Sequence, residues 1–133
     1  MFGDLGMRAV FAANVLVAGI VGFSSLFTPE RATQTVFEGT ASPGAAMGVT
    51  GAFWVTAALL SIAGLVWPTR MAPVLLVQLC YKALWLAFFA APAWQAGRPV
   101  PSGIASFFAV WVVVLPFVIP WRALFGAAHC RRR

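Results

Sequence analysis

Acidic side chains are scarce in this sequence, and charged residues are few altogether. Its 133 residues include 3 Asp and Glu against 9 Lys and Arg, and 9% of the chain is charged whereas 62% is hydrophobic. Soluble domains average about 25% charged residues, so this chain has too little polar surface for a globule in water. The composition therefore predicts an integral membrane protein. It also argues against a proton-coupled pump, because no acid lies within a long apolar run.

Histidine and closely spaced cysteines are lacking as well. The one histidine is His129, near the C-terminal end, and the two cysteines, Cys80 and Cys130, form no C-x-x-C pair. Haem-type groups in a membrane are usually held by a histidine within a helix, and thiol relays and metal-thiolate sites need cysteines at short spacing. We therefore expect no metal site, no cofactor bound through a side-chain ligand and no enzymatic chemistry. Contact with a lipid, a quinone or a carotenoid stays open.

The sequence contains four long apolar runs, at about residues 7–27, 44–67, 73–91 and 104–121. Each is close to the ~20 residues that cross ~30 Å of hydrocarbon as a helix. They predict an all-α fold in which residues 1–133 form one domain of four transmembrane helices in an antiparallel bundle. The short stretch from Pro68 to Ala72 leaves room only for a tight hairpin between the second and third helices.

A short segment between the first two runs carries helix signals of its own. Thr28 is an N-cap residue, Pro29 suits the first helical position, and Gly39 is suited to end a helix. Apolar and polar side chains are mixed between these limits. We predict a short amphipathic helix lying on the outer surface of the membrane.

Most cations lie at the ends of the apolar runs. Arg31 and Arg98 fall on one side of the predicted membrane, and six fall on the other: Arg8, Arg70, Arg122, Arg131, Arg132 and Arg133. Because cytoplasmic loops carry the excess of cations, we predict a multi-pass protein of the bacterial plasma (inner) membrane with both termini in the cytoplasm. The net charge of +6 is then a topology signal and does not indicate nucleic-acid binding. Arg122 and the three terminal arginines are candidates for contact with anionic lipid headgroups.

Lys82 is the exception, because it lies near the middle of the third run. Gln78, Tyr81 and Trp85 follow the same helical face, so these four residues form one polar and aromatic stripe. In one interpretation Lys82 is a site for an anion, a proton or a headgroup, either charged over Trp85 or neutral, and in a proton-coupled scheme Glu38 folds inward as its counter-ion. In the other it is structural: its stem snorkels, or its amine bonds to carbonyls and to Asn14 of the first helix.

Small residues recur at helical spacing in the first two runs. Gly44, Gly48 and Ala52 form a smooth stripe on the second helix, and Ala18 and Gly22 form one on the first. Such stripes allow close helix contact in membranes. We expect them to pack within the chain, with a dimer face as the alternative.

The order of these features resembles small bacterial four-helix membrane proteins of the DoxX-like type. The resemblance rests on a first helix that closes on Phe27, Thr28 and Pro29, a short outer helix, a glycine-rich second helix and a tight hairpin to the third. It implies a four-helix membrane fold and, for some members, association with quinone-linked oxidation. No catalytic residue is carried over by it. Small multidrug exporters are a poor match, since their first helix carries an essential glutamate and position 14 here is Asn14.

Three functional hypotheses follow. The first is a non-enzymatic accessory or scaffold subunit of a larger membrane complex of the respiratory or photosynthetic type. The second is a small oligomeric transporter or channel working around Lys82, Gln78 and Tyr81. The third is a DoxX-like membrane anchor of a quinone-linked oxidoreductase. In each case the expected partners are membrane lipids together with other membrane subunits or further copies of the chain.

Overall fold

The chain is all-helical over the part that its computed structural model describes, residues 3–126. The helices are α1 (Gly3–Phe27), α2 (Pro29–Thr35), α3 (Ala45–Val66), α4 (Ala72–Trp85), the π-helix η1 (Leu86–Ala90), α5 (Ala91–Gln95), α6 (Ser102–Val118) and α7 (Trp121–Phe125). The predicted all-α class is confirmed. The candidate headgroup residues Arg131, Arg132 and Arg133, like His129 and Cys130, lie outside the described residues.

Three helices are long and apolar enough to cross a membrane. They are α1 with 25 residues, α3 with 22, and the continuous helix Ala72–Gln95 with 24, which joins α4, η1 and α5. The prediction of transmembrane helices is confirmed to this extent. The fourth predicted helix is the shorter α6, of 17 residues.

The end of α6 follows from its prolines. Pro120 disfavours a helical conformation at Ile119, which is extended with ψ 126°. Because Pro120 has no N–H, the Pro116 carbonyl loses its helical donor. The indole of Trp121 donates to that carbonyl at 2.7 Å instead. The sequence-based boundary at residue 121 is therefore wrong, and α6 ends at Val118 before the chain resumes as α7.

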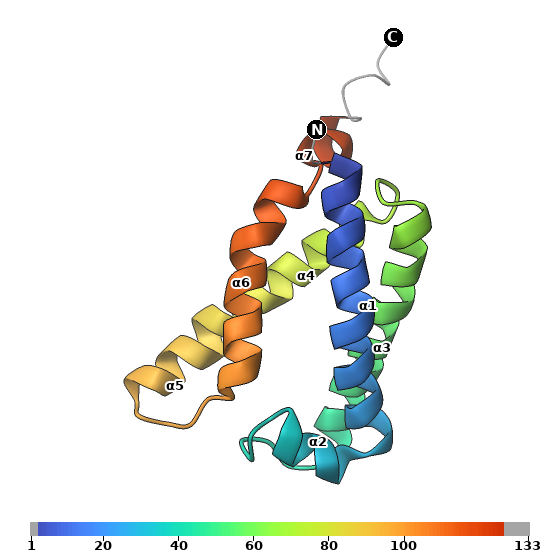
Figure 1. Ribbon diagram of the computed structural model, residues 1–133. Helices are drawn as coiled ribbons and strands as arrows, with labels where there is room; N and C mark the ends of the chain where they lie inside the picture. The colour runs from blue at the N-terminus through green and yellow to red at the C-terminus, as the bar shows by residue number, and fades with distance from the viewer. Residues whose placement is uncertain (1–2, 127–133) are drawn as a thin grey trace.

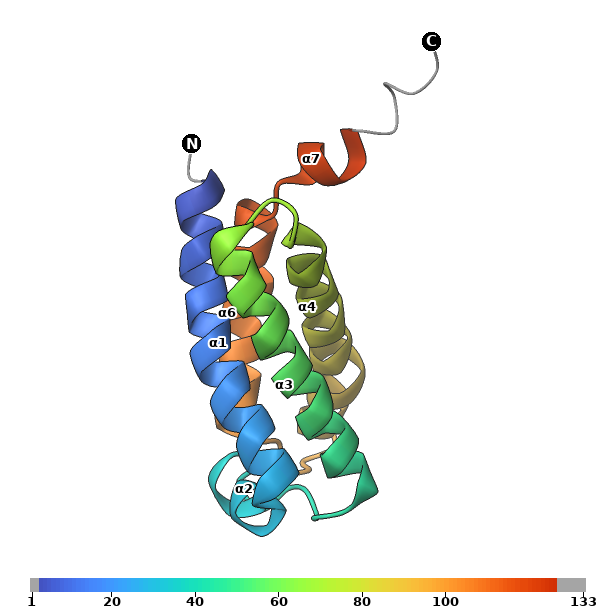
Figure 2. The same ribbon diagram turned by 90° about the vertical axis from the view of Figure 1, so that its right-hand side faces the viewer.

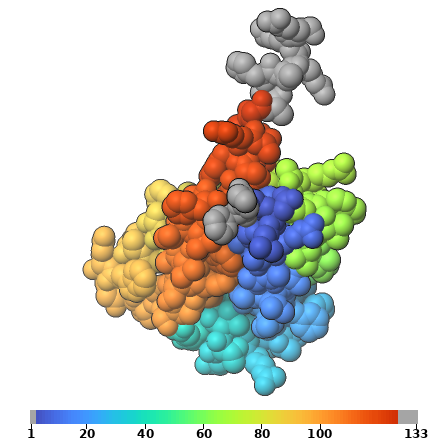
Figure 3. Space-filling view, turned by 45° about the horizontal axis from the view of Figure 1, so that its top comes forward, coloured from blue at the N-terminus to red at the C-terminus, as the bar shows by residue number. Residues whose placement is uncertain are grey.

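The long helices lie side by side, with the first turns of α1 and α7 at one end of the molecule and α2 at the other (Figures 1 and 2). The turn between Val66 and Ala72 forms the predicted tight hairpin. We call the end with α2 the outer end, as a label for this end of the molecule and not for a side of the membrane. On the surface, α6 lies between α1 and the α5 end of the third long helix (Figure 3).

Glycines set the contact between α1 and α3. A Cβ on Gly22 would lie 2.6 Å from the Val55 nitrogen, and one on Gly51 would lie 2.9 Å from the Leu26 nitrogen. The two backbones therefore touch here, and Ala18 is buried on the same face of α1. The predicted packing role of Ala18 and Gly22 is confirmed.

The predicted intramolecular packing of Gly44, Gly48 and Ala52 is wrong. A Cβ on Gly44 or Gly48 would meet nothing within 4 Å, and Ala52 is exposed. The buried face of α3 instead passes through Met47 and Gly51, which each lie one residue before Gly48 and Ala52 of the predicted stripe. Consecutive residues are ~100° apart around a helix, so this offset turns the stripe outward.

Candidate functional site

Two apolar clusters fill the inside of the bundle. The inner one is formed by Met7, Val10, Phe11, Ala72, Leu75, Trp111, Leu115 and Ile119, and the outer one by Ala18, Trp54, Ala58 and Phe108. Buried polar residues lie between the two clusters along three of the helices: Asn14 on α1, Ser61 on α3, and Gln78 and Lys82 on α4. We call these four residues the polar layer.

Lys82 is enclosed within the bundle, with 1% of its surface exposed. Its Nζ donates a hydrogen bond of 2.8 Å to Gln78 Oε1, one turn earlier on α4. Four aromatic rings surround the amine, with centroids 5.0 Å away for Tyr81, 5.6 Å for Phe107, 5.7 Å for Phe108 and 5.9 Å for Trp111. Lys82 therefore does not snorkel, and the rings near its amine differ from the expected Trp85.

The polar layer has more donors than acceptors. Asn14 Nδ2 and Gln78 Nε2 of this layer, and Trp111 Nε1 beside it, are buried and have no hydrogen-bond partner among the described residues. The Ser61 hydroxyl donates to the Ala57 carbonyl of its own helix at 2.7 Å. The expected bond between Lys82 and Asn14 is not among the hydrogen bonds of the described chain. Buried unpaired donors are uncommon in folded proteins and call for an explanation.

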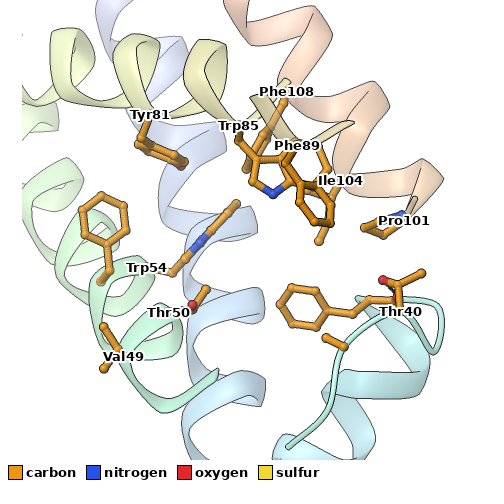
Figure 4. Close-up of a pocket in the computed structure, with 13 residues that line it drawn as sticks. Thr40, Val49, Thr50, Trp54, Tyr81, Trp85, Phe89, Pro101, Ile104 and Phe108 are labelled. Carbon is orange, nitrogen blue, oxygen red and sulfur yellow. Dashed lines mark hydrogen bonds between the residues drawn. The ribbon is translucent and has the colours of Figure 1, made fainter. Parts of the chain in front are cut away.

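A cavity of about 500 Å³ lies in the outer half of the molecule. It is bounded by α3, the third long helix, α6 and the loop after α2 (Figure 4). Its lining consists of Phe37, Thr40, Ala41, Val49, Thr50, Phe53, Trp54, Tyr81, Trp85, Phe89, Pro101, Ile104 and Phe108. We call it the aromatic cavity.

Phe108 organises the wall of the aromatic cavity. Its ring stacks on Trp54 at a centroid distance of 5.8 Å and meets Tyr81 and Trp85 edge-on at 5.6 and 5.2 Å. These are favourable geometries for aromatic pairs. The four rings come from three helices, so the helix contacts fix the wall before any ligand arrives.

The π-helix η1 borders the same cavity. Its wide turn follows Trp85 directly and contains Phe89, and the two rings lie 5.2 Å apart on the cavity wall. Single π-turns within α-helices are frequent at functional sites. The sequence carries no signal that we could have used to predict this turn.

The predicted stripe on the third run divides into two parts. Gln78 and Lys82 belong to the polar layer, whereas Tyr81 and Trp85 line the aromatic cavity. Asn14 is buried on α1 between residues of the two apolar clusters, as a polar-layer residue. Sequence reasoning missed Trp54 and Phe108, although both are aromatic residues inside apolar runs. Arg122 is exposed on α7 and is remote in sequence from both sites.

Glu38 lies in the loop between α2 and α3, which we call the outer loop, and it fastens this loop to α6. Its carboxylate accepts hydrogen bonds from the Ser102 and Gly103 amides at 3.0 and 2.9 Å and from the Ser102 hydroxyl at 3.0 Å. The Gly103 and Ser102 amides, followed by the Ser102 hydroxyl, hold the pKa of Glu38 below its ordinary value. The idea that Glu38 folds inward toward Lys82 is therefore wrong. A second cavity, of about 260 Å³, lies beside this contact and includes Phe107 in its lining.

In comparisons with known protein families, with curated proteins and with solved structures, no significant match to this chain was found.

Proposed function

We propose that this protein is a non-enzymatic, four-span membrane protein of the bacterial plasma membrane that binds a lipid-soluble molecule in its aromatic cavity. In this proposal α6 is the fourth span, both termini are cytoplasmic, and the protein works as an accessory subunit of a larger assembly. The aromatic cavity is the observation that carries the proposal.

The size and lining of the cavity support binding. Ligand pockets typically enclose about 300–1,000 Å³ and are lined mainly by apolar and aromatic side chains with few polar groups. The aromatic cavity, at about 500 Å³, falls in this range, and its polar side chains include Thr40, Thr50 and Tyr81. Such a lining suits a lipid chain, a quinone ring or part of a carotenoid.

The outward faces of the helices support a role within an assembly. Gly44, Gly48 and Ala52 present a smooth strip that is not used inside the chain. Phe88 on η1 and Trp94 on α5 are well exposed. A partner helix or a second copy of the chain could approach closely along the strip.

The enclosure of Lys82 favours binding over transport. A channel through the polar layer would require four rings to move away from the amine. A DoxX-like anchor role is compatible with the proposal if the bound molecule is a quinone.

The test is to fill the cavity. Thr50 lines it, and its hydroxyl donates only to the Ala46 carbonyl of its own helix. We expect Thr50→Phe to abolish co-purification of a lipid-soluble molecule in mild detergent, measured by mass spectrometry of solvent extracts. Thr56→Phe is the matched control, because Thr56 lies on the same helix, donates to the Ala52 carbonyl in the same way and does not line the aromatic cavity. Equal ligand content in wild type and both variants would contradict the proposal.

A further inference from the structure

We propose that the molecule bound in the aromatic cavity is an amphiphile with a carboxylate head group, and that Lys82 and Gln78 bind this head group. The inference rests on the proposed function, since it assigns a chemical class to the ligand of the same cavity.

The first argument is charge. The three acids of the sequence are Asp4, Glu30 and Glu38, and all three are exposed in the described structure. Glu38 is engaged by the first turn of α6. None of these side chains neutralises Lys82, and a buried ammonium is costly unless it is paired. A negative charge supplied by a ligand would balance it.

The second argument is hydrogen bonding. A lysine ammonium has three donors, and within residues 3–126 the one acceptor that Lys82 reaches is Gln78 Oε1. In the same part of the chain, the amide nitrogen of Gln78 and the indole nitrogen of Trp111 are buried beside it without partners. A carboxylate has two oxygens that accept hydrogen bonds and donate none. It therefore supplies what this part of the polar layer lacks.

The third argument is position. Tyr81 and Phe108, whose ring centroids lie 5.0 and 5.7 Å from the Lys82 amine, both line the aromatic cavity. The amine therefore lies directly behind the cavity wall. Tyr81 is only partly buried, and a shift of its ring would let a head group reach the amine while the apolar chain stays among the aromatic side chains.

The test compares a long-chain fatty acid, brominated on its chain, with its methyl ester. The two probes have the same chain, but only the acid carries a charge. Bromine quenches tryptophan fluorescence, and Trp54 and Trp85 line the cavity. The measurement uses the full chain in nonionic detergent, at a pH at which the acid is ionised. We expect wild type to bind the acid at least ~10-fold more tightly than the ester, which corresponds to about 1.4 kcal/mol.

Lys82→Met is expected to remove this preference by weakening the binding of the acid, and quenching by the ester reports whether the cavity of the variant has folded. Lys82→Arg should keep the preference. A preference that survives in Lys82→Met, or equal binding of acid and ester by wild type, would overturn the carboxylate assignment and leave the proposed function standing. If wild type binds neither probe and Thr50→Phe changes nothing, the proposed function fails together with the inference.

Short-chain butyrate serves as a third probe. It carries the carboxylate without the chain, so it should not displace the brominated acid at equal concentration. Displacement by butyrate would show that the site binds small free anions, and it would overturn the assignment of the ligand as an amphiphile.

Discussion

The two sides of the bundle are packed on different principles. On one side α1 and α3 meet through glycine, with Gly22 and Gly51 so close that an added Cβ would strike backbone atoms. On the other side the third long helix and α6 pack against each other through Tyr81, Trp85 and Phe108, and the aromatic cavity lies between these rings and α3. Small residues let two helix backbones come into direct contact, whereas packed aromatic rings leave empty space at their edges. The rigid pair is thus a frame, and the aromatic side is the place where a ligand fits.

The largest effect is expected at the glycine contact. Gly22→Ala should destabilise the protein by about 3 kcal/mol, at the upper end of overpacking penalties, because backbone atoms of α3 must shift. Thermal unfolding in detergent measures this. Gly19→Ala is the matched control, since a Cβ there meets nothing within 4 Å. Equal unfolding temperatures for the two variants would show that the α1–α3 contact is not the rigid side.

A smaller effect, of opposite sign, is expected in the polar layer. The double variant Lys82→Met with Gln78→Leu replaces both partners, so it removes the buried amine and leaves no unused acceptor behind. We expect the ligand-free protein to gain about 1 kcal/mol, because apolar replacement of a buried polar pair is often stabilising. The same unfolding measurement applies. Gln78→Leu alone should destabilise, since it leaves Lys82 without its acceptor, and a stabilised single variant would contradict this explanation.

The smallest effect is expected at the outer loop. The folded-state pKa of Glu38 is lowered, so its contribution to stability is present above the unfolded pKa and is lost as the pH falls through the folded value. The protection of the Ser102 and Gly103 amides, meaning their exchange rate compared with the intrinsic rate at the same pH, should therefore fall in acid.

Glu38→Gln should show the lower protection of these amides already at neutral pH, and that protection should no longer depend on pH. Glu30→Gln, at an exposed acid of α2 that is absent from this contact, should behave as wild type. Identical acid sensitivity in Glu38→Gln and wild type would mean that another group holds the loop.

The sequence was sufficient to predict the helical class and the hairpin after α3, and it singled out Lys82, because these depend on local hydropathy and on one basic residue in an apolar run. It was not sufficient for contacts between helices. Gly44 is the N-cap of α3, and Gly48 and Gly51 lie within the helix. Only the crossing with α1 decides that Gly51 is the one whose added Cβ would meet another backbone. Likewise, Phe108 reads as one more apolar residue until Trp54 and Tyr81 are brought to it from other helices.

The early end of α6 has a consequence for the surrounding bilayer. At 1.5 Å per residue, its 17 residues cover about 25 Å, whereas the apolar run 7–27 within α1 covers about 31 Å. Hydrocarbon ~30 Å thick is too thick for the first and matches the second. With α6 as the proposed fourth span, lipids beside it are compressed, whereas lipids beside α1 are not. Such a thickness gradient favours neighbours whose own hydrophobic belts are short on the α6 side.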